Sequence, residues 1–225
     1  MDTVTQPERI PLSRMRRAIA RSMTASAQIP QFTVEVDASI VDLGGLRSAL
    51  RDEGIRISYS DAIVVACAAE LVAHPIVNAS FDGDALVVHP EVHVGIAVSL
   101  DDGLVAPAIR NADKLSLREI ESDRVRLTQA AQDGTLSPED LLCATFTISN
   151  LGPLGISRFR ALVVPPQAAI LAVGAIDGDG RISLALSCDH RVLDGAPAAR
   201  FLAAVVARLQ DLDWVEALAR RHSRE

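Results

Sequence analysis

The chain has 225 residues and a formal net charge of −7 at pH 7, and 49% of its residues are hydrophobic while only 3% are aromatic. The acidic charge, and the shortage of aromatic side chains that could stack on bases, argue against a nucleic-acid partner or an anionic membrane. The length suits one large domain or two small ones, with a core built from aliphatic side chains.

Cysteine usage and hydropathy narrow the class further. The three cysteines are widely spaced, at Cys67, Cys143 and Cys188, which predicts reduced and mostly buried thiols. Cys188 and His190 are not accompanied by a second pair of ligands, so we expect no metal. The longest apolar run, 161–176, is interrupted by two prolines and is too short to span a bilayer. Without a signal-peptide pattern, the sequence predicts a cytoplasmic protein with no membrane partner.

The first half of the chain predicts mainly helices. In chain order the expected elements are an arm at 1–10, a helix at 13–27, a strand at 32–39 and helices at 39–53 and 61–73. Ser13 is the expected cap of the first helix, and Ser60 that of the last. Pro75 is expected to stop that last helix, which is apolar on nearly all sides and therefore buried.

The second half predicts alternating strands and helices. A DG turn leads into a strand at 85–88, and 93–109 is expected to form a hairpin around Asp102 and Gly103. Ser116 and Glu119 form a capping box for a helix ending near residue 132, and a short helical turn opens at Ser137. Further strands are expected at 143–149, 168–176 and 181–187, and helices at 195–210 and 213–220.

No internal repeat and no linker-like composition divides the chain. Strands and helices are interleaved throughout, so we expect a single α/β domain at 11–225, with a mixed sheet covered by helices.

The most informative segment is SCDHRVLDGAPAARF, residues 187–201, in which His190, Asp194 and Gly195 follow an alternating strand pattern. An imidazole at a strand end can accept a proton from a thiol or hydroxyl near neutral pH. The carboxylate four residues later can hold the local loop or an arginine. The spacing alone is equally consistent with an ordinary surface loop.

A second segment, TFTISNLGPLGISRF at 145–159, places Ser149 and Asn150 at the end of a strand, before a loop with Gly152 and Gly155. Such a strand end can aim a hydroxyl at a site, and the glycines allow close backbone approach. The segment lacks the G-x-S-x-G of a nucleophile elbow and the lysine of a phosphate-binding loop. By itself it is also compatible with a polar strand end and a tight turn.

Six segments in order resemble the catalytic domain of the dihydrolipoamide acyltransferases of 2-oxoacid dehydrogenase complexes, and more distantly chloramphenicol acetyltransferase. They are IPLSRMRRAIARSM, VNASFDGD, VHVGIAVSLDDGLVAPAIRNADKLSL, TFTISNLGPLGISRF, VVPPQAAILAVGAI and SCDHRVLDGAPAARFL. The resemblance spans about residues 10–209 and implies a chloramphenicol acetyltransferase-like two-layer sandwich.

The resemblance also implies roles for single residues. His190 would be the general base toward the thiol or hydroxyl that attacks an acyl-CoA thioester, and Ser149 would donate to the oxyanion. Asp194 would form a salt bridge with Arg17, or with Arg16 as the second choice, and so hold the histidine loop. Asn150 and Gly195 are expected to support the site. Transfer would be direct, without an acyl-enzyme.

The family further implies a homotrimer with active sites between subunits, so His190 and Ser149 should lie far apart within one chain. Coenzyme A, supplied as acetyl-CoA, would be a substrate, and no lipoyl group is expected on this chain. The candidate CoA contacts are Ser157, Arg158 and Pro166.

The acceptor remains open between two readings. The sequence begins about ten residues before the resemblance and ends in the charged segment DWVEALARRHSRE, which favours a stand-alone O-acetyltransferase acting on a small alcohol, as in tetronate-type natural-product biosynthesis. The alternative is the core of a 2-oxoacid dehydrogenase complex that uses dihydrolipoamide. A non-catalytic scaffold subunit is a third reading, against which the intact His190, Ser149, Asp194 and Arg17 argue. Condensation-type acyltransferases are about twice as long and are excluded.

Overall fold

The computed structural model describes residues 9–220, so residues 1–8 of the expected arm and 221–225 of the expected domain lie outside the described residues. The α-helices are α1 (Arg14–Ser26), α2 (Val41–Asp52), α3 (Tyr59–Ala73), α4 (Leu117–Gln132), α5 (Pro138–Leu142), α6 (Gly195–Gln210) and α7 (Leu212–Arg220). Three short 3₁₀ turns are η1 (Pro75–Asn78), η2 (Ala112–Lys114) and η3 (Gly152–Leu154).

The strands are β1 (Gln31–Ser39), β2 (Ala79–Asp82), β3 (Ala85–Val88), β4 (Val94–Ile96), β5 (Val98–Leu100), β6 (Gly103–Val105), β7 (Ala108–Ile109), β8 (Phe146–Asn150), β9 (Ala169–Ile176) and β10 (Arg181–Asp189). Six of them form one sheet in the order β1-β10-β9-β8-β4-β7. β8 pairs in parallel with β4 and β9, and the other pairs are antiparallel. The mixed sheet expected from the sequence is therefore confirmed.

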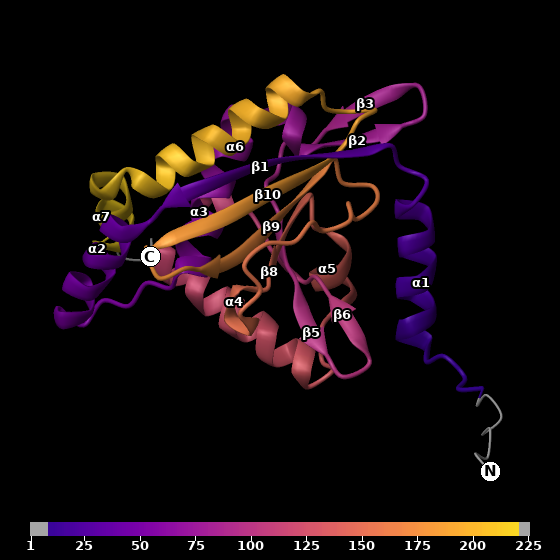
Figure 1. Cartoon of the computed structure of the whole chain (residues 1–225). Helices are drawn as coiled ribbons and strands as arrows, with labels where there is room; N and C mark the ends of the chain where they lie inside the picture. The colour runs from indigo at the N-terminus through magenta and orange to yellow at the C-terminus, as the bar shows by residue number, and fades with distance from the viewer. Residues whose placement is uncertain (1–8, 221–225) are drawn as a thin grey trace, which may run out of the picture.

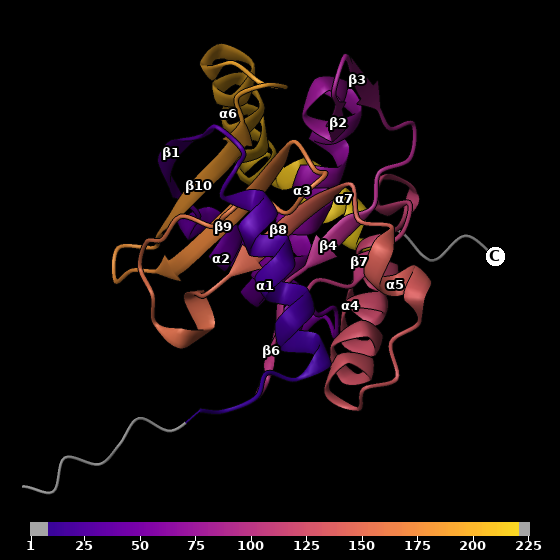
Figure 2. The same cartoon turned by 90° about the vertical axis from the view of Figure 1, so that its right-hand side faces the viewer.

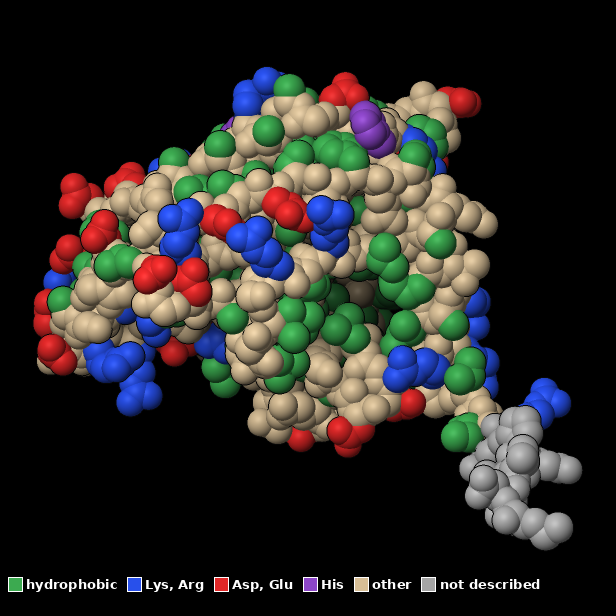
Figure 3. Space-filling model, in the orientation of Figure 1, with side chains coloured by type: hydrophobic (Ala, Val, Ile, Leu, Met, Phe, Trp, Pro, Cys, Tyr) green, Lys and Arg blue, Asp and Glu red, His purple; other side chains and the backbone are tan. Residues whose placement is uncertain are grey.

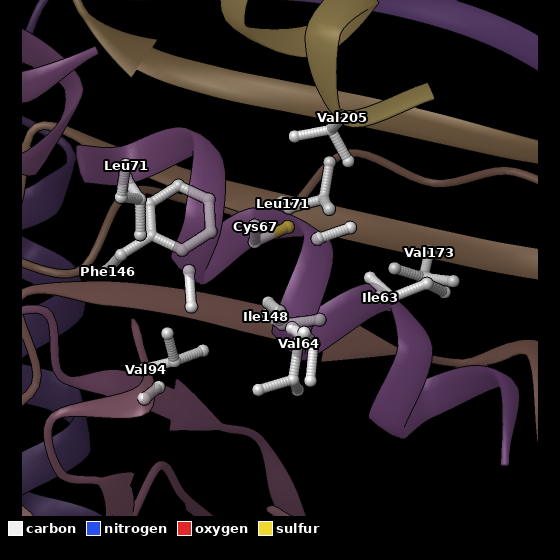
Figure 4. Close-up of a cluster of buried hydrophobic side chains, with 14 of the residues drawn as sticks. Ile63, Val64, Cys67, Leu71, Val94, Phe146, Ile148, Leu171, Val173 and Val205 are labelled. Carbon is white, nitrogen blue, oxygen red and sulfur yellow. The ribbon is translucent and has the colours of Figure 1, made fainter. Parts of the chain in front are cut away.

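The main core lies between this sheet and the helices (Figure 4). The buried face of α3, with Ile63, Val64 and Cys67, packs toward Phe146 and Ile148 of β8. α6 lies along β1 and β10 and also packs on α3 (Figure 1). Because successive strand residues face opposite sides, the side chains between Phe146 and Ile148, and after Ile148, point away from these helices.

The opposite face of the sheet is covered by the segment 156–168. A small cluster of Ile29, Val163 and Ile170 packs there, and Thr147 Oγ1 donates a hydrogen bond to Gln167 Oε1 at 2.7 Å. α1 stands beside this part of the molecule and contacts β6 (Figure 2). Basic and acidic side chains alternate over the surface where Figure 1 places β1, β9 and β10 (Figure 3).

One local expectation is corrected and another is confirmed. Ser58, and not Ser60, caps α3, because its hydroxyl accepts from Asp61 N–H and the helix begins at Tyr59. The hairpin expected at 93–109 is confirmed: β5 pairs with β6 around the turn, and β4 pairs with β7 in the same register. β4 also pairs in parallel with β8, which joins the hairpin to the main sheet.

Within residues 9–220, no helix combines the length and the hydrophobicity that crossing a bilayer requires.

Candidate active site

His190 is presented at the end of β10 by contacts with the start of β1. Its backbone N–H donates to Pro30 O at 2.8 Å, and its ring lies 4.6 Å from the Phe32 ring at a tilt of 53°. The His190 side chain is 50% exposed. Its Nδ1 is 3.6 Å from Asp194 Oδ1, and Nε2 has no hydrogen bond or ion pair among the described residues. The imidazole is therefore supported on one side and open on the other.

The two neighbours of His190 form an ion pair. Arg191 Nε and Nη2 donate to the two carboxylate oxygens of Asp189 at 2.9 and 2.7 Å, and the Arg191 backbone N–H donates to Oδ1 at 2.9 Å. These hydrogen bonds raise the pKa of the Arg191 guanidinium above its usual value. The guanidinium also lies over the Phe81 ring, 4.4 Å from its centroid.

The expected salt bridge between Asp194 and Arg17 is not present in the described chain. Arg17 Nη1 instead donates to Leu12 O at 2.6 Å, and Arg16 has no ion pair with Asp194 either. The Arg17 end of α1 packs toward the β5–β6 hairpin, where Ile19 closes on Gly103, which removes it from the β10 end. Asp194 is 85% exposed and faces His190, so within the described chain it does not form the salt bridge that the family resemblance implies.

Ser149 lies in β8, the central parallel strand of the sheet, and is 9% exposed. Its backbone is fixed on both sides, because β8 is hydrogen-bonded to β4 and to β9. Its hydroxyl makes no hydrogen bond with any described residue. By strand alternation it faces away from α3. A hydroxyl held rigidly without an internal partner is free to donate to a ligand.

Asn150, the next residue, points to the helix side. Its Nδ2 donates to Ser60 Oγ at 3.2 Å, and its Oδ1 accepts from Gly152 N–H at 2.9 Å. A Cβ on Gly152 would lie 2.6 Å from Gly174 O, and one on Gly174 would overlap Ser157 O. Glycine is thus required at both positions for the loop after β8 to run against β9.

His190 and Ser149 are well separated within one chain. Ser149 is level with Ala172 of β9, which is level with Ala185 of β10. His190 lies five residues beyond Ala185, so strand geometry places the two residues roughly 19 Å apart. The two catalytic candidates do not meet in the described chain.

A groove runs along the N-terminal end of α3, formed by three adjoining pockets of about 400, 420 and 170 Å³. The first two share Arg47 and Ser58, and the last two share Ser60 and Asn150. We call it the α3 groove. Its inner pocket is mostly apolar, but Arg124 stands in its wall and is bound to the buried Asp61 at 2.6 Å.

The outer end of the α3 groove is basic. Arg47, Arg51 and Arg56 line it together with Glu121. Arg47 is fixed by a 2.7 Å hydrogen bond to Ile57 O and by stacking on the Tyr59 ring. Our sequence reasoning missed this cluster. The available signal was the four-residue spacing of Arg47 and Arg51, which puts both on one face of a helix.

The weaker sequence candidates have other contacts. Arg158 forms an ion pair with Asp37 at 2.5 Å, and the Ser157 carbonyl packs on Gly174. Pro166 follows Pro165 in a cis peptide, and none of the three lines the α3 groove. A Cβ on Gly195 would meet no atom within 4 Å, so close packing within the chain does not require glycine there.

The cysteines are free thiols. Burial raises the pKa of Cys188 to about 12 and raises that of Cys67 further still. Among the described residues, no group of three or more His, Cys, Asp or Glu side chains is arranged to hold a metal ion.

Comparison with known families gives a match over residues 4–216 to the model "2-oxoacid dehydrogenases acyltransferase (catalytic domain)". A dihydrolipoyllysine-residue acetyltransferase component of the Zymomonas mobilis pyruvate dehydrogenase complex is 39% identical over 87% of this chain and 48% of its own length. The corresponding component of the Bacillus subtilis acetoin cleaving system is 35% identical over 91% of this chain and 56% of its own. The chain therefore spans about half the length of these relatives.

Among solved structures, an Azotobacter vinelandii dihydrolipoamide acetyltransferase matches with a TM-score of 0.86 and 32% identity, over 95% of each chain. That protein was studied for the role of a serine, a histidine and an asparagine in its catalytic mechanism. A chloramphenicol acetyltransferase matches with a TM-score of 0.52 and 13% identity, over 89% of this chain and 95% of its own, which shows likeness of fold alone.

Proposed function

Because the chain belongs to the 2-oxoacid dehydrogenase acyltransferase (catalytic domain) family, we propose that it transfers an acyl group between coenzyme A and the thiol of a dihydrolipoyl group. The observation that carries the proposal is the His190 imidazole at the end of β10, whose ring is backed by Phe32 and whose Nε2 is open. We further propose that residues 11–225 act as one acyltransferase domain.

In the proposed reaction His190 Nε2 accepts the proton of the attacking thiol as its sulfur forms a bond with the thioester carbonyl carbon. The tetrahedral intermediate carries its negative charge on the former carbonyl oxygen. When it collapses, the bond to the CoA sulfur breaks and the imidazolium returns its proton to that sulfur. The contact of Nδ1 with Asp194 is too long for a hydrogen bond and both side chains are exposed, so solvent screens the pair.

Ser149 would supply the oxyanion donor. Its hydroxyl is unpaired and rigidly placed, so little reorganisation is needed when charge develops on the oxygen. In the Azotobacter vinelandii relative, the named serine, histidine and asparagine make a comparable set, and this supports assigning Ser149 and His190. In that comparison the third residue is an amide, which suggests that the Asp194 charge is not essential.

The separation of His190 and Ser149 requires a second chain. We propose a homotrimer in which His190 of one subunit meets Ser149 of its neighbour. A cyclic, head-to-tail interface brings two different surfaces together and closes after three copies. The exposed aliphatic side chains of β3, Leu86, Val87 and Val88, are compatible with such an interface.

The α3 groove is the proposed CoA site, in place of Ser157, Arg158 and Pro166. Arg47, Arg51 and Arg56 offer guanidinium groups to the phosphates of CoA, which arginine recognises well. From there the groove runs to Asn150 at the end of β8. The Ser149 hydroxyl faces the other side of the sheet, so the thioester would reach it around the end of β8. The cluster is local, since the chain as a whole is acidic.

The relatives named above act on dihydrolipoyllysine residues, which favours a dihydrolipoyl thiol over the small alcohol expected from the sequence. A natural-product acceptor finds no support among them.

The test supplies acetyl-CoA with either dihydrolipoamide or a panel of small primary alcohols and follows free CoA and the acetylated acceptor by mass spectrometry. We expect acetyl-dihydrolipoamide as the preferred product. A preference for an alcohol would instead support the hypothesis of a stand-alone O-acetyltransferase. No transfer to any acceptor would favour the hypothesis of a non-catalytic scaffold subunit.

A further inference from the structure

We infer that the Asp189–Arg191 ion pair, and not Asp194, is the positioning device that holds His190 in its productive orientation; this rests on the proposed function. The pair brackets His190 in sequence, since its members are the residues directly before and after it. Closing an ion pair between positions one before and one after a residue fixes the path of the backbone through that residue.

The Asp189 side of the ion pair is held in place by burial and by hydrogen bonds. The Asp189 side chain is 2% exposed, and its backbone N–H donates to Ala168 O at 2.8 Å. The Asp189 carbonyl accepts from Val192 and Leu193 N–H at 3.0 and 2.9 Å. The carboxylate receives two side-chain donors and one backbone donor from Arg191. A planar guanidinium on a carboxylate fixes both distance and orientation.

The Arg191 side of the ion pair is held in place as well. Arg191 stacks on Phe81 of β2. β2 is itself tied to Ala168, because Ala168 N–H donates to Ala79 O at 3.0 Å. Asp189 and β2, the strand that carries the Phe81 ring under Arg191, are thus both hydrogen-bonded to Ala168. The His190 turn, β2 and the segment before β9 therefore form one rigid unit.

Asp194 lacks these properties. It precedes α6 as its N-cap residue but makes no capping hydrogen bond. Its carboxylate is 85% exposed and 3.6 Å from His190 Nδ1. Exposed pairs of this kind contribute little to holding a side chain in place.

A matched control exists elsewhere in the chain. Arg208 donates to the buried Glu70 at 2.7 Å and lies over the Trp214 ring at 4.8 Å. The exposed fractions of the two arginine side chains are 36% for Arg191 and 34% for Arg208. Both pairs thus join a buried carboxylate to a ring-stacked arginine, but only one of them brackets His190.

The experiment is a pair of double-mutant cycles on the full chain, with acetyl-CoA and dihydrolipoamide as substrates. One cycle uses Asp189→Asn, Arg191→Gln and the double variant; the other uses Glu70→Gln, Arg208→Gln and their double. Each variant is measured for kcat, both KM values and thermal midpoint, at matched folded fraction. Arg191→Lys is added as the variant that keeps the positive charge but loses the planar guanidinium, and with it the paired hydrogen bonds to the carboxylate.

We expect Arg191→Gln to lower kcat by about tenfold to about a hundredfold, with both KM values within about twofold of the wild type. Asp189→Asn should do the same, and the double variant should lose no more than the worse single, since both act through one unit. The Glu70 and Arg208 variants should lower the thermal midpoint and leave kcat within about twofold. If Arg191→Gln does not fold, Arg191→Lys should show the same pattern with a smaller loss of kcat.

A kcat within about twofold of the wild type in Arg191→Gln, or in Arg191→Lys where it carries the test, would overturn the inference, as would a loss confined to KM. Equal losses of kcat in the Arg208 cycle would also overturn it, because they would reveal a general effect of stability. A wild-type protein without acetyl transfer would overturn the proposed function itself, and this inference with it.

Discussion

The His190 turn and the Ser149 strand end solve the same problem in opposite ways. Ser149 is held by its backbone, because β8 is paired on both sides, and its hydroxyl needs no side-chain support. His190 lies beyond the last ladder pair of β10 and is half exposed. It is held by side chains: the Phe32 ring and the neighbouring Asp189–Arg191 pair. The proposed oxyanion donor is thus fixed by the sheet, whereas the proposed base, which lies beyond the end of the sheet, is fixed by side chains.

The largest effect on kcat should come from replacing His190, the exposed residue of the two. In His190→Ala the base is lost altogether, so we expect kcat for acetyl transfer to dihydrolipoamide to fall by roughly 10⁴-fold, the upper end of the range for general base catalysis. Steady-state kinetics with both substrates measures this. A rate within about tenfold of the wild type would contradict the assigned role.

Replacing Ser149, the buried residue of the two, should lower kcat by less. Ser149→Ala removes one oxyanion donor and leaves β8 intact, so kcat should fall by about 10²-fold with a smaller change in KM. Thr147→Ala is the matched control on the same face of the same strand, because the Thr147 hydroxyl is occupied by its hydrogen bond to Gln167. Equal losses in the two variants would indicate damage to the sheet in place of a lost donor.

A third prediction concerns the α3 groove, the proposed CoA site, which ends near the end of β8. Losing one charge-assisted contact to a phosphate costs about 1.4 kcal/mol, so Arg56→Ala should raise the KM for acetyl-CoA about tenfold, with kcat little changed. Added salt should reduce the difference in KM between Arg56→Ala and the wild type, because screening weakens the attraction between Arg56 and the phosphate in the wild type.

Arg110→Ala removes an exposed arginine that is paired with Glu139 at the other edge of the sheet, and it should leave the KM unchanged. An Arg56→Ala protein with wild-type KM would exclude the basic cluster as the phosphate site.

The smallest effect concerns the thiol next to the His190 turn. Burial raises the pKa of Cys188 to about 12, so near neutral pH an uncharged disulfide reagent should label Cys143 first and leave Cys188 intact in the native protein. The Cys188 pKa is higher in the folded state than in the unfolded chain, so burial of the neutral thiol stabilises the fold. This contribution is present below the unfolded pKa of about 8.5 and is lost as the pH rises toward 12. Mass mapping of labelled peptides tests the order of labelling, and labelling of Cys188 as fast as of Cys143 would contradict the prediction.

Much of the fold followed from local sequence signals. The capping box at Ser116 and Glu119, the cap at Ser13 and the alternation of β1 and β10 each predicted an element that the structure contains. These signals are local, since each depends on residues within a few positions of one another.

The errors arose where distant residues decide the outcome. The turn signal near Asp102 correctly predicts the 93–109 hairpin, but it does not reveal that β4 also pairs with β8, about fifty positions later. Likewise, the Arg17–Asp194 salt bridge was transferred from a family resemblance, but α1 carries Arg17 toward the β5–β6 hairpin. The Asp189–Arg191 pair is the reverse case: both residues flank His190 in the sequence, but only their burial and the Phe81 platform indicate a role.

The central claim is that one active site takes His190 from one chain and Ser149 from another. The direct test is to unfold and refold, or co-express, the inactive His190→Ala and Ser149→Ala proteins together in equal amounts. Random assembly into symmetric trimers should restore about a quarter of the wild-type rate, because that share of interfaces pairs an intact His190 with an intact Ser149. Recovery no greater than the sum of the two separate variants, in a mixture shown to contain mixed trimers, would contradict the account.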